Sequence, residues 1–150
     1  MKRLLALCLL LFAGSVLAGP RIQHWTLPSG LSVYFLEAHE LPMVDLKLVF
    51  DAGSARDGDL PGLASMTAGE LFSGTRSLDL ETLSDRLDRV GADYGAGALR
   101  DMAWIALRSL TDADALQPAL DTWLQVVGEP AFPAEHFERA RRQRLVALRA

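Results

Sequence analysis

The sequence has 150 residues, 50% of them apolar, and a formal net charge of −4. This composition supports a buried core and excludes an intrinsically disordered chain. Removing Lys2 and Arg3 from the 15 basic residues leaves 13 against 19 acidic residues, a net charge of −6 that argues against nucleic acid as a partner.

Residues 1–18 have the pattern of a secretory signal peptide. They contain a charged start, an apolar run and a small-residue cleavage site, at residues 2–3, 4–12 and 16–18. The apolar run is too short to cross a bilayer of about 30 Å, which disfavours a retained anchor. We therefore expect an exported protein, periplasmic or secreted, with no stable membrane span after cleavage. The single cysteine, Cys8, lies inside the apolar run, so the mature chain from Gly19 has no disulfide.

The mature chain, residues 19–150, has the length of one domain and alternates between strand and helix patterns. Strands are predicted at residues 22–27, 31–36, 43–50, 92–99 and 102–110. Helices are predicted at residues 61–74, 79–90, about 118–128 and 133–150. Ser29 and Gly30 predict a hairpin turn between the first two strands. We expect the third helix to begin only near Pro118, because proline lacks the amide hydrogen that a helix interior needs.

This order of elements predicts an α+β fold with a largely antiparallel sheet and helices packed on one face. The last helix pattern reaches Ala150 without a C-terminal cap. We therefore expect the domain to be incomplete, with the chain ending inside a larger architecture.

Several segments in this order carry a family resemblance. They are S-G-L-S-V-Y-F-L-E (29–37), L-P-M-V-D-L-K-L-V-F-D-A-G-S (41–54), P-G-L-A (61–64), L-F-S-G-T (71–75), L-D-R-V-G-A (87–92) and P-A-F-P-A-E-H-F-E-R (130–139). The chain resembles the pitrilysin–insulinase family of zinc metallopeptidases, which includes the mitochondrial processing peptidases. The resemblance covers almost all of the mature chain and implies the N-terminal domain of such a peptidase.

The resemblance also implies where a metal site would lie. In the family, G-L-A is followed on a helix by His-x-x-Glu-His, in which two histidines bind zinc and the glutamate acts as general base. A further glutamate downstream completes the metal shell. Without gaps, the histidine positions fall on Ser65 and Gly69 and the base position on Ala68. The downstream ligand position falls on or about Val146.

None of these four residues can perform the family's chemistry. Gly69, Ala68 and Val146 have no polar side-chain atom, and a serine hydroxyl is a poor zinc ligand at neutral pH. The three histidines of the sequence, His24, His39 and His136, do not share metal-ligand spacing. We therefore predict no catalytic residue, no metal and no cofactor in this chain, and a degenerate, non-catalytic member of the family. The arginine-rich stretch 139–149 is interpreted as a solvated or subunit-facing surface.

Three functions remain open from the sequence. The first is a non-catalytic partner subunit of an exported zinc protease: a zinc-bearing family member would be the hetero-oligomer partner, and zinc would lie only there. Ser65, Ala68 and Gly69 would then leave a shallow surface of the peptide-binding chamber, where an extended peptide adds to a sheet edge. The second is a binding or assembly protein of the cell envelope without a protease partner. The third, less favoured, is an active metallopeptidase with other ligands.

Overall fold

The computed structural model describes residue 19 and residues 21–149. The predicted signal peptide, residues 1–18, lies outside the described residues. The chain divides into two units, the first ending at Leu41 and the second beginning at Pro42. The expectation of one domain over residues 19–150 stays a prediction. Among the residues that the structure describes, no helix is long and apolar enough to cross a membrane.

The first unit is an antiparallel hairpin of β1 (Ile22–Thr26) and β2 (Ser32–Leu36). Gly30 adopts a positive φ of 86° in the turn, a conformation that glycine reaches without steric cost. The predicted hairpin and its turn are therefore confirmed.

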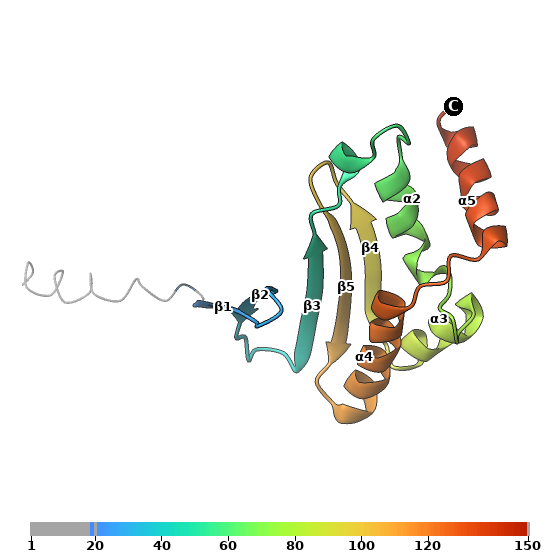
Figure 1. Cartoon of the computed structure of the whole chain (residues 1–150). Coiled ribbons are helices and arrows are strands. Elements are labelled where there is room, and N and C mark those ends of the chain that lie inside the picture. Colours follow the sequence, from blue (N-terminus) through green and yellow to red (C-terminus); the bar gives the residue numbers. More distant parts are fainter. Residues whose placement is uncertain (1–18, 20, 150) are drawn as a thin grey trace, which may run out of the picture. The chain divides into compact units, whose positions relative to one another are not determined.

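The second unit contains an antiparallel sheet in the order β3–β5–β4, formed by β3 (Met43–Phe50), β5 (Ala103–Leu110) and β4 (Asp93–Ala98). The register pairs Leu46 with Leu107 and Leu48 with Ile105, so apolar side chains share one face. Helices cover this face (Figure 1), and the core between the two layers contains Leu78, Leu83, Leu87, Ile105, Leu107, Ala119, Trp123 and Val126. The predicted α+β class, with helices on one face of an antiparallel sheet, is confirmed.

The opposite face of the sheet has charged side chains between exposed apolar ones such as Val49 and Leu110. Arg108 forms an ion pair with Asp45 across the β3–β5 register, and its guanidinium holds the pKa of that carboxyl below its ordinary value. Lys47 lies over the Trp104 ring, 4.8 Å from its centroid. This alternation of apolar and charged positions along β3 is the pattern from which the strand was predicted.

Four α-helices and two short 3₁₀ segments complete the second unit. Their bounds are η1 (Ser54–Arg56), α2 (Leu63–Glu70), η2 (Leu71–Ser73), α3 (Leu80–Arg89), α4 (Ala113–Gly128) and α5 (Ala134–Ala147). Helix α3 begins as predicted, with the Asp79 carboxylate accepting from the Thr82 amide at 2.8 Å. Helix α5 contacts α2 and lies on its outer side, away from the sheet (Figure 1).

Two predicted helix starts are wrong. Pro118 lies inside α4, which begins at Ala113, because the Asp112 side chain caps its first turn through the Asp114 amide at 2.9 Å. The proline removes one hydrogen bond, while buried Trp123 and Val126 hold the helix against the core. Helix α2 begins at Leu63 rather than at Pro61, after a left-handed Gly62.

Candidate functional site

The candidate site is helix α2, which carries three of the four sequence-predicted positions. The turn before it is fixed on the sheet by backbone hydrogen bonds, from the Ser54 amide to the Leu99 carbonyl and from the Ala55 amide to the Arg100 carbonyl, both at 2.8 Å. Gly53 makes this approach possible. A Cβ there would lie 2.4 Å from the Arg100 carbonyl oxygen and 2.5 Å from the Met102 amide nitrogen, so only glycine fits.

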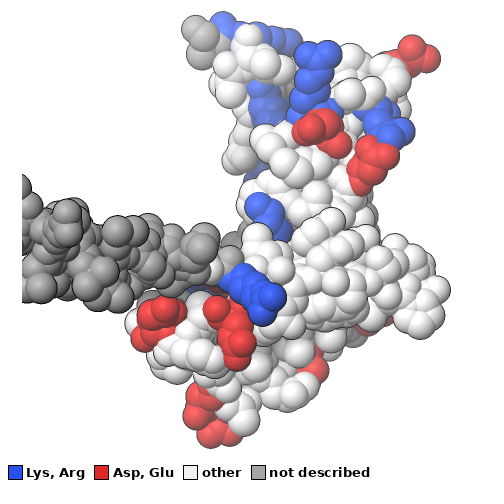
Figure 2. Space-filling view, turned by 90° about the vertical axis from the view of Figure 1, so that its left-hand side faces the viewer, with Lys and Arg blue, Asp and Glu red and all other residues white. Residues whose placement is uncertain are grey.

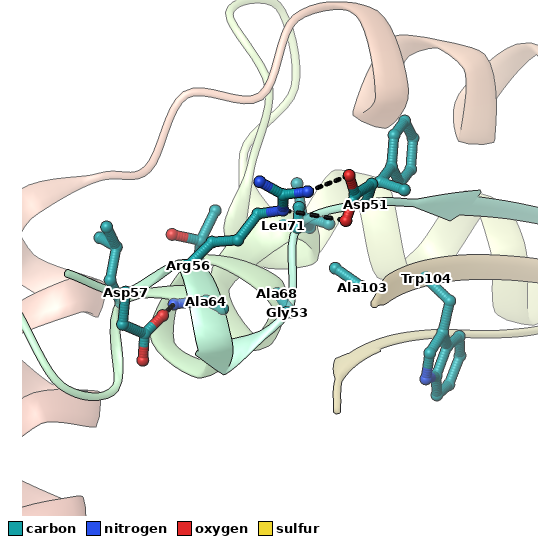
Figure 3. Close-up of a pocket in the computed structure, with 13 residues that line it drawn as sticks. Asp51, Gly53, Arg56, Asp57, Ala64, Ala68, Leu71, Ala103 and Trp104 are labelled. Carbon is teal, nitrogen blue, oxygen red and sulfur yellow. Dashed lines mark hydrogen bonds and ion pairs between the residues drawn. The ribbon is translucent and has the colours of Figure 1, made fainter. Parts of the chain in front are cut away.

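The N-terminus of α2 is capped by a residue outside the helix. The carboxylate of Asp57 accepts hydrogen bonds from the amides of Gly62 at 2.7 Å and Ala64 at 2.8 Å, and Figure 3 shows it directed at the backbone of Ala64. Asp57 is 9% exposed and α2 has no side-chain cap of its own. A negative charge at a helix N-terminus satisfies amides that have no partner within the helix. Asp57 therefore fixes the start of the helix on which the site lies.

Ala68, the position of the family's general base, is only 5% exposed. It lies in the wall of an open, mostly apolar cavity of about 400 Å³ between α2, η1 and the adjoining ends of β3 and β5. Figure 3 shows Ala64 and Ala68 on the α2 side of this cavity, with the Arg56–Asp51 ion pair near it. A methyl group can neither accept nor donate a proton, so this position cannot act as an acid or a base.

Ser65 and Gly69, one helical turn apart, face helix α5 instead. Arg144 of α5 donates from Nη1 to the Ser65 hydroxyl oxygen at 2.6 Å and from Nη2 to the Ser65 carbonyl at 3.0 Å. A Cβ on Gly69 would lie 2.8 Å from the same Nη2. The guanidinium therefore lies across both positions at which the family resemblance places metal-binding histidines. Gly69 stays exposed beside the guanidinium, and the shallow surface expected at Ser65, Ala68 and Gly69 stays a prediction.

Val146, the fourth predicted position, is not brought to the other three. Its side chain is 68% exposed. Two residues along an α-helix correspond to a rotation of about 200°, so Val146 points away from the face of α5 that carries Arg144. The α5 side chain that reaches α2 at this site is Arg144. The sequence predicts a solvated or subunit-facing surface for residues 139–149, whereas the structure places Arg144, half-buried, in contact with Ser65.

The residues of this site do not fit a zinc ion. A zinc site requires three protein ligands of the Cys, His, Asp or Glu type, and Ser65, Ala68, Gly69 and Arg144 provide none. A fixed positive charge also lies where a cation would bind. Across residues 19 and 21–149, no three His, Cys, Asp or Glu side chains gather as a possible metal site. The prediction that the whole chain uses no metal or cofactor stays a prediction.

The residues that the resemblance aligns with the catalytic motif therefore lack the chemistry of a zinc peptidase. The sequence profile of the insulinase family (peptidase family M16) matches residues 33–149 of this chain. The chain belongs to this family. No curated protein matches it.

The solved structures that are similar to this chain include the following two. One is a peptidase M16 inactive domain from Pseudomonas fluorescens, with 42% identity, a TM-score of 0.81 and 85% of this chain covered. The other is a protease from Helicobacter pylori, with 18% identity, a TM-score of 0.70 and 83% covered, a likeness that supports the fold alone. The chain spans about a third of their length, 31% and 30%. It is a homologue of an inactive domain of the family.

Proposed function

We propose that this protein is a non-catalytic partner of an exported zinc peptidase of the same family and helps to bind the substrate peptide. The observation that carries the proposal is the contact of Arg144 with Ser65 beside Gly69. At Ser65, Ala68 and Gly69, the positions that the resemblance aligns with the catalytic motif, helix α2 has no His, Cys, Asp or Glu side chain to bind a metal or accept a proton. The likeness to an inactive M16 domain supports the same conclusion.

The peptide would bind at the edge of the sheet next to α2. Strand β4 pairs with β5 on one side, and no other strand of the described chain pairs with its second side. Helix α2 packs against β4, so this edge lies beside the altered motif (Figure 1). An extended peptide can add to such an edge through main-chain hydrogen bonds. Gly95, Ala96 and Gly97 of β4 are half-buried small residues and place no bulky side chain of their own beside this edge.

Export and the location of the zinc complete the proposal. The signal pattern of residues 1–18 supports a periplasmic or secreted protein. Zinc would be bound by the partner subunit, since Ser65, Ala68 and Gly69 of this chain cannot replace the zinc ligands of the family.

The test compares the protein alone, a zinc-bearing family member from the same organism alone, and both together. We expect the lone protein to contain no zinc after dialysis and to leave peptides intact. The mixture should co-purify and cleave peptides faster than the zinc-bearing member alone. Stoichiometric zinc and peptide cleavage by the lone protein would show an active metallopeptidase instead. No association and no change in cleavage would favour the alternative, an envelope binding or assembly protein without a protease partner.

A further inference from the structure

Arg144 is a half-buried cation whose hydrogen-bond partners are neutral. Its two bonds go to the hydroxyl and the carbonyl of Ser65. The ion pairs within residues 19 and 21–149 involve other groups, and no Asp or Glu oxygen of these residues lies within 4.0 Å of the Arg144 nitrogens. Partial burial of a charge without an opposite charge is unfavourable. This arrangement suits an anion that is supplied from outside the described chain.

The geometry of the guanidinium favours a carboxylate. An arginine has five N–H donors in a planar fork, and the two bonds to Ser65 use two of them. The remaining donors can hold a planar carboxylate by two parallel hydrogen bonds. Ser65 fixes the guanidinium in place, so little rotamer freedom is lost when an anion binds.

The site is also accessible. Gly69 is exposed and has no side chain, and Arg144 Nη2 lies only 2.8 Å from where a Cβ would be. A ligand can therefore approach the guanidinium over the backbone of Gly69.

The surrounding charge is favourable for an anion. Helix α5 carries four arginines and two glutamates, Arg139, Arg141, Arg142, Arg144, Glu135 and Glu138. Figure 2 views the side of the molecule that lies on the left in Figure 1, opposite α5, and there basic and acidic side chains lie together in the upper part of the view. Local positive potential raises the concentration of negatively charged groups near the site.

We propose that Arg144, held by Ser65 and exposed by Gly69, is a carboxylate-binding site that recognises an acidic peptide. The carboxylate is either an aspartate or glutamate side chain or the peptide's C-terminus. This inference rests on the proposed peptide-binding function and names the chemical class of the peptide.

The test is an NMR titration of the arginine Nε–Hε signals of the protein, with the Arg144 signal assigned by its loss in Arg144→Lys. The probes are sodium acetate, a capped hexapeptide with one central glutamate, its glutamine counterpart, and the glutamine peptide with a free C-terminal carboxylate. We expect acetate and the glutamate peptide to shift the Arg144 signal in a saturable way. The glutamate peptide should bind about tenfold more tightly than the glutamine peptide, as a charge-assisted hydrogen bond implies. The free-carboxylate peptide shows whether a C-terminus serves as well as a side chain.

Two variants distinguish binding at Arg144 from a general attraction of anions to the positive charge of α5. Arg144→Gln should abolish the preference for carboxylate, and Arg142→Gln, on the same helix, should keep it. Equal loss in both variants, or an Arg144 signal that responds to neither acetate nor peptides, would overturn the carboxylate site. A response to acetate without binding of any peptide would support the site and contradict the proposed peptide-binding function.

Discussion

The two sides of helix α2 differ in the contacts that they make. On the side of the sheet and of η1, the Gly53 turn, the Asp57 cap and Ala68 form the contacts that hold the helix in place. On the side of α5 lie Ser65 and Gly69, the positions at which the family resemblance predicts the metal ligands, and an arginine lies across them. The contacts that hold α2 in place therefore involve other residues than the contact between Ser65 and Arg144, and substitutions on the two sides should have separate effects.

The largest expected effect comes from restoring ligands on the α5 side. Ser65→His, Ala68→Glu, Gly69→His and Arg144→Glu together place two histidines one turn apart on α2 opposite a carboxylate on α5, the ligand types that zinc prefers. We expect a zinc dissociation constant of about 1 µM or tighter, a binding free energy of about 8 kcal/mol, measured by competition with a chelating dye.

The matched control for this graft keeps Arg144 and carries Val146→Glu with the same three changes on α2. Because Val146 is 68% exposed and points away from the Arg144 face, this variant should bind zinc at least about tenfold more weakly. Equal zinc binding by the two variants would contradict the assignment of position 144 to the site.

A substitution on the other side of α2, toward the sheet, should lower the stability of the protein strongly. Gly53→Ala introduces a Cβ within 2.4–2.5 Å of backbone atoms of Arg100 and Met102, which cannot rotate away as a side chain can. We expect a loss of about 3 kcal/mol in the free energy of unfolding, measured by urea denaturation. Gly128→Ala is the control, since nothing lies within 4 Å of a Cβ there. A loss of equal size in both variants would show that the close approach at Gly53 is not the cause.

Removing the cap of α2 should lower the free energy of unfolding somewhat less than Gly53→Ala does. Asp57→Ala leaves the amides of Gly62 and Ala64 without their acceptor and should cost about 2 kcal/mol of unfolding free energy. Asp59→Ala, an exposed position in the same loop, should change it by less than about 0.5 kcal/mol. Hydrogen exchange localises the effect: the α2 amides should lose protection in Asp57→Ala and keep it in Asp59→Ala.

The sequence predicts those parts of the fold that local patterns determine. The alternation in β3, the turn at Gly30 and the cap at Asp79 each depend on residues close in the chain, and the structure confirms them. Pro118 misled the prediction because packing of α4 on the core outweighs one lost hydrogen bond.

The sequence did not predict the longer-range contacts of the site. Asp57 caps amides that lie five and seven residues further along the chain, those of Gly62 and Ala64. An acidic residue shortly before a helix without a local side-chain cap is the sequence signal that could have indicated this contact. Arg144 lies 79 residues from Ser65, and no pattern in one sequence links the two. The positions on α2 could be aligned through the family's motif, while the α5 residue that reaches them depends on how the two helices pack.

The smallest expected effect tests whether Arg144 and Gly69 are coupled. Gly69→Ala should gain up to about 1 kcal/mol in helix propensity, but its Cβ would lie 2.8 Å from Arg144 Nη2 and displace the guanidinium. Loss of the two hydrogen bonds to Ser65 costs about 1 kcal/mol, so the net change in unfolding free energy should stay within about 0.5 kcal/mol. In an Arg144→Ala background nothing remains to be displaced, and the same change should stabilise the protein by about 1 kcal/mol. Such a double-mutant cycle gives a coupling free energy near 1 kcal/mol if the guanidinium lies over Gly69 in solution, and a coupling near zero if it does not.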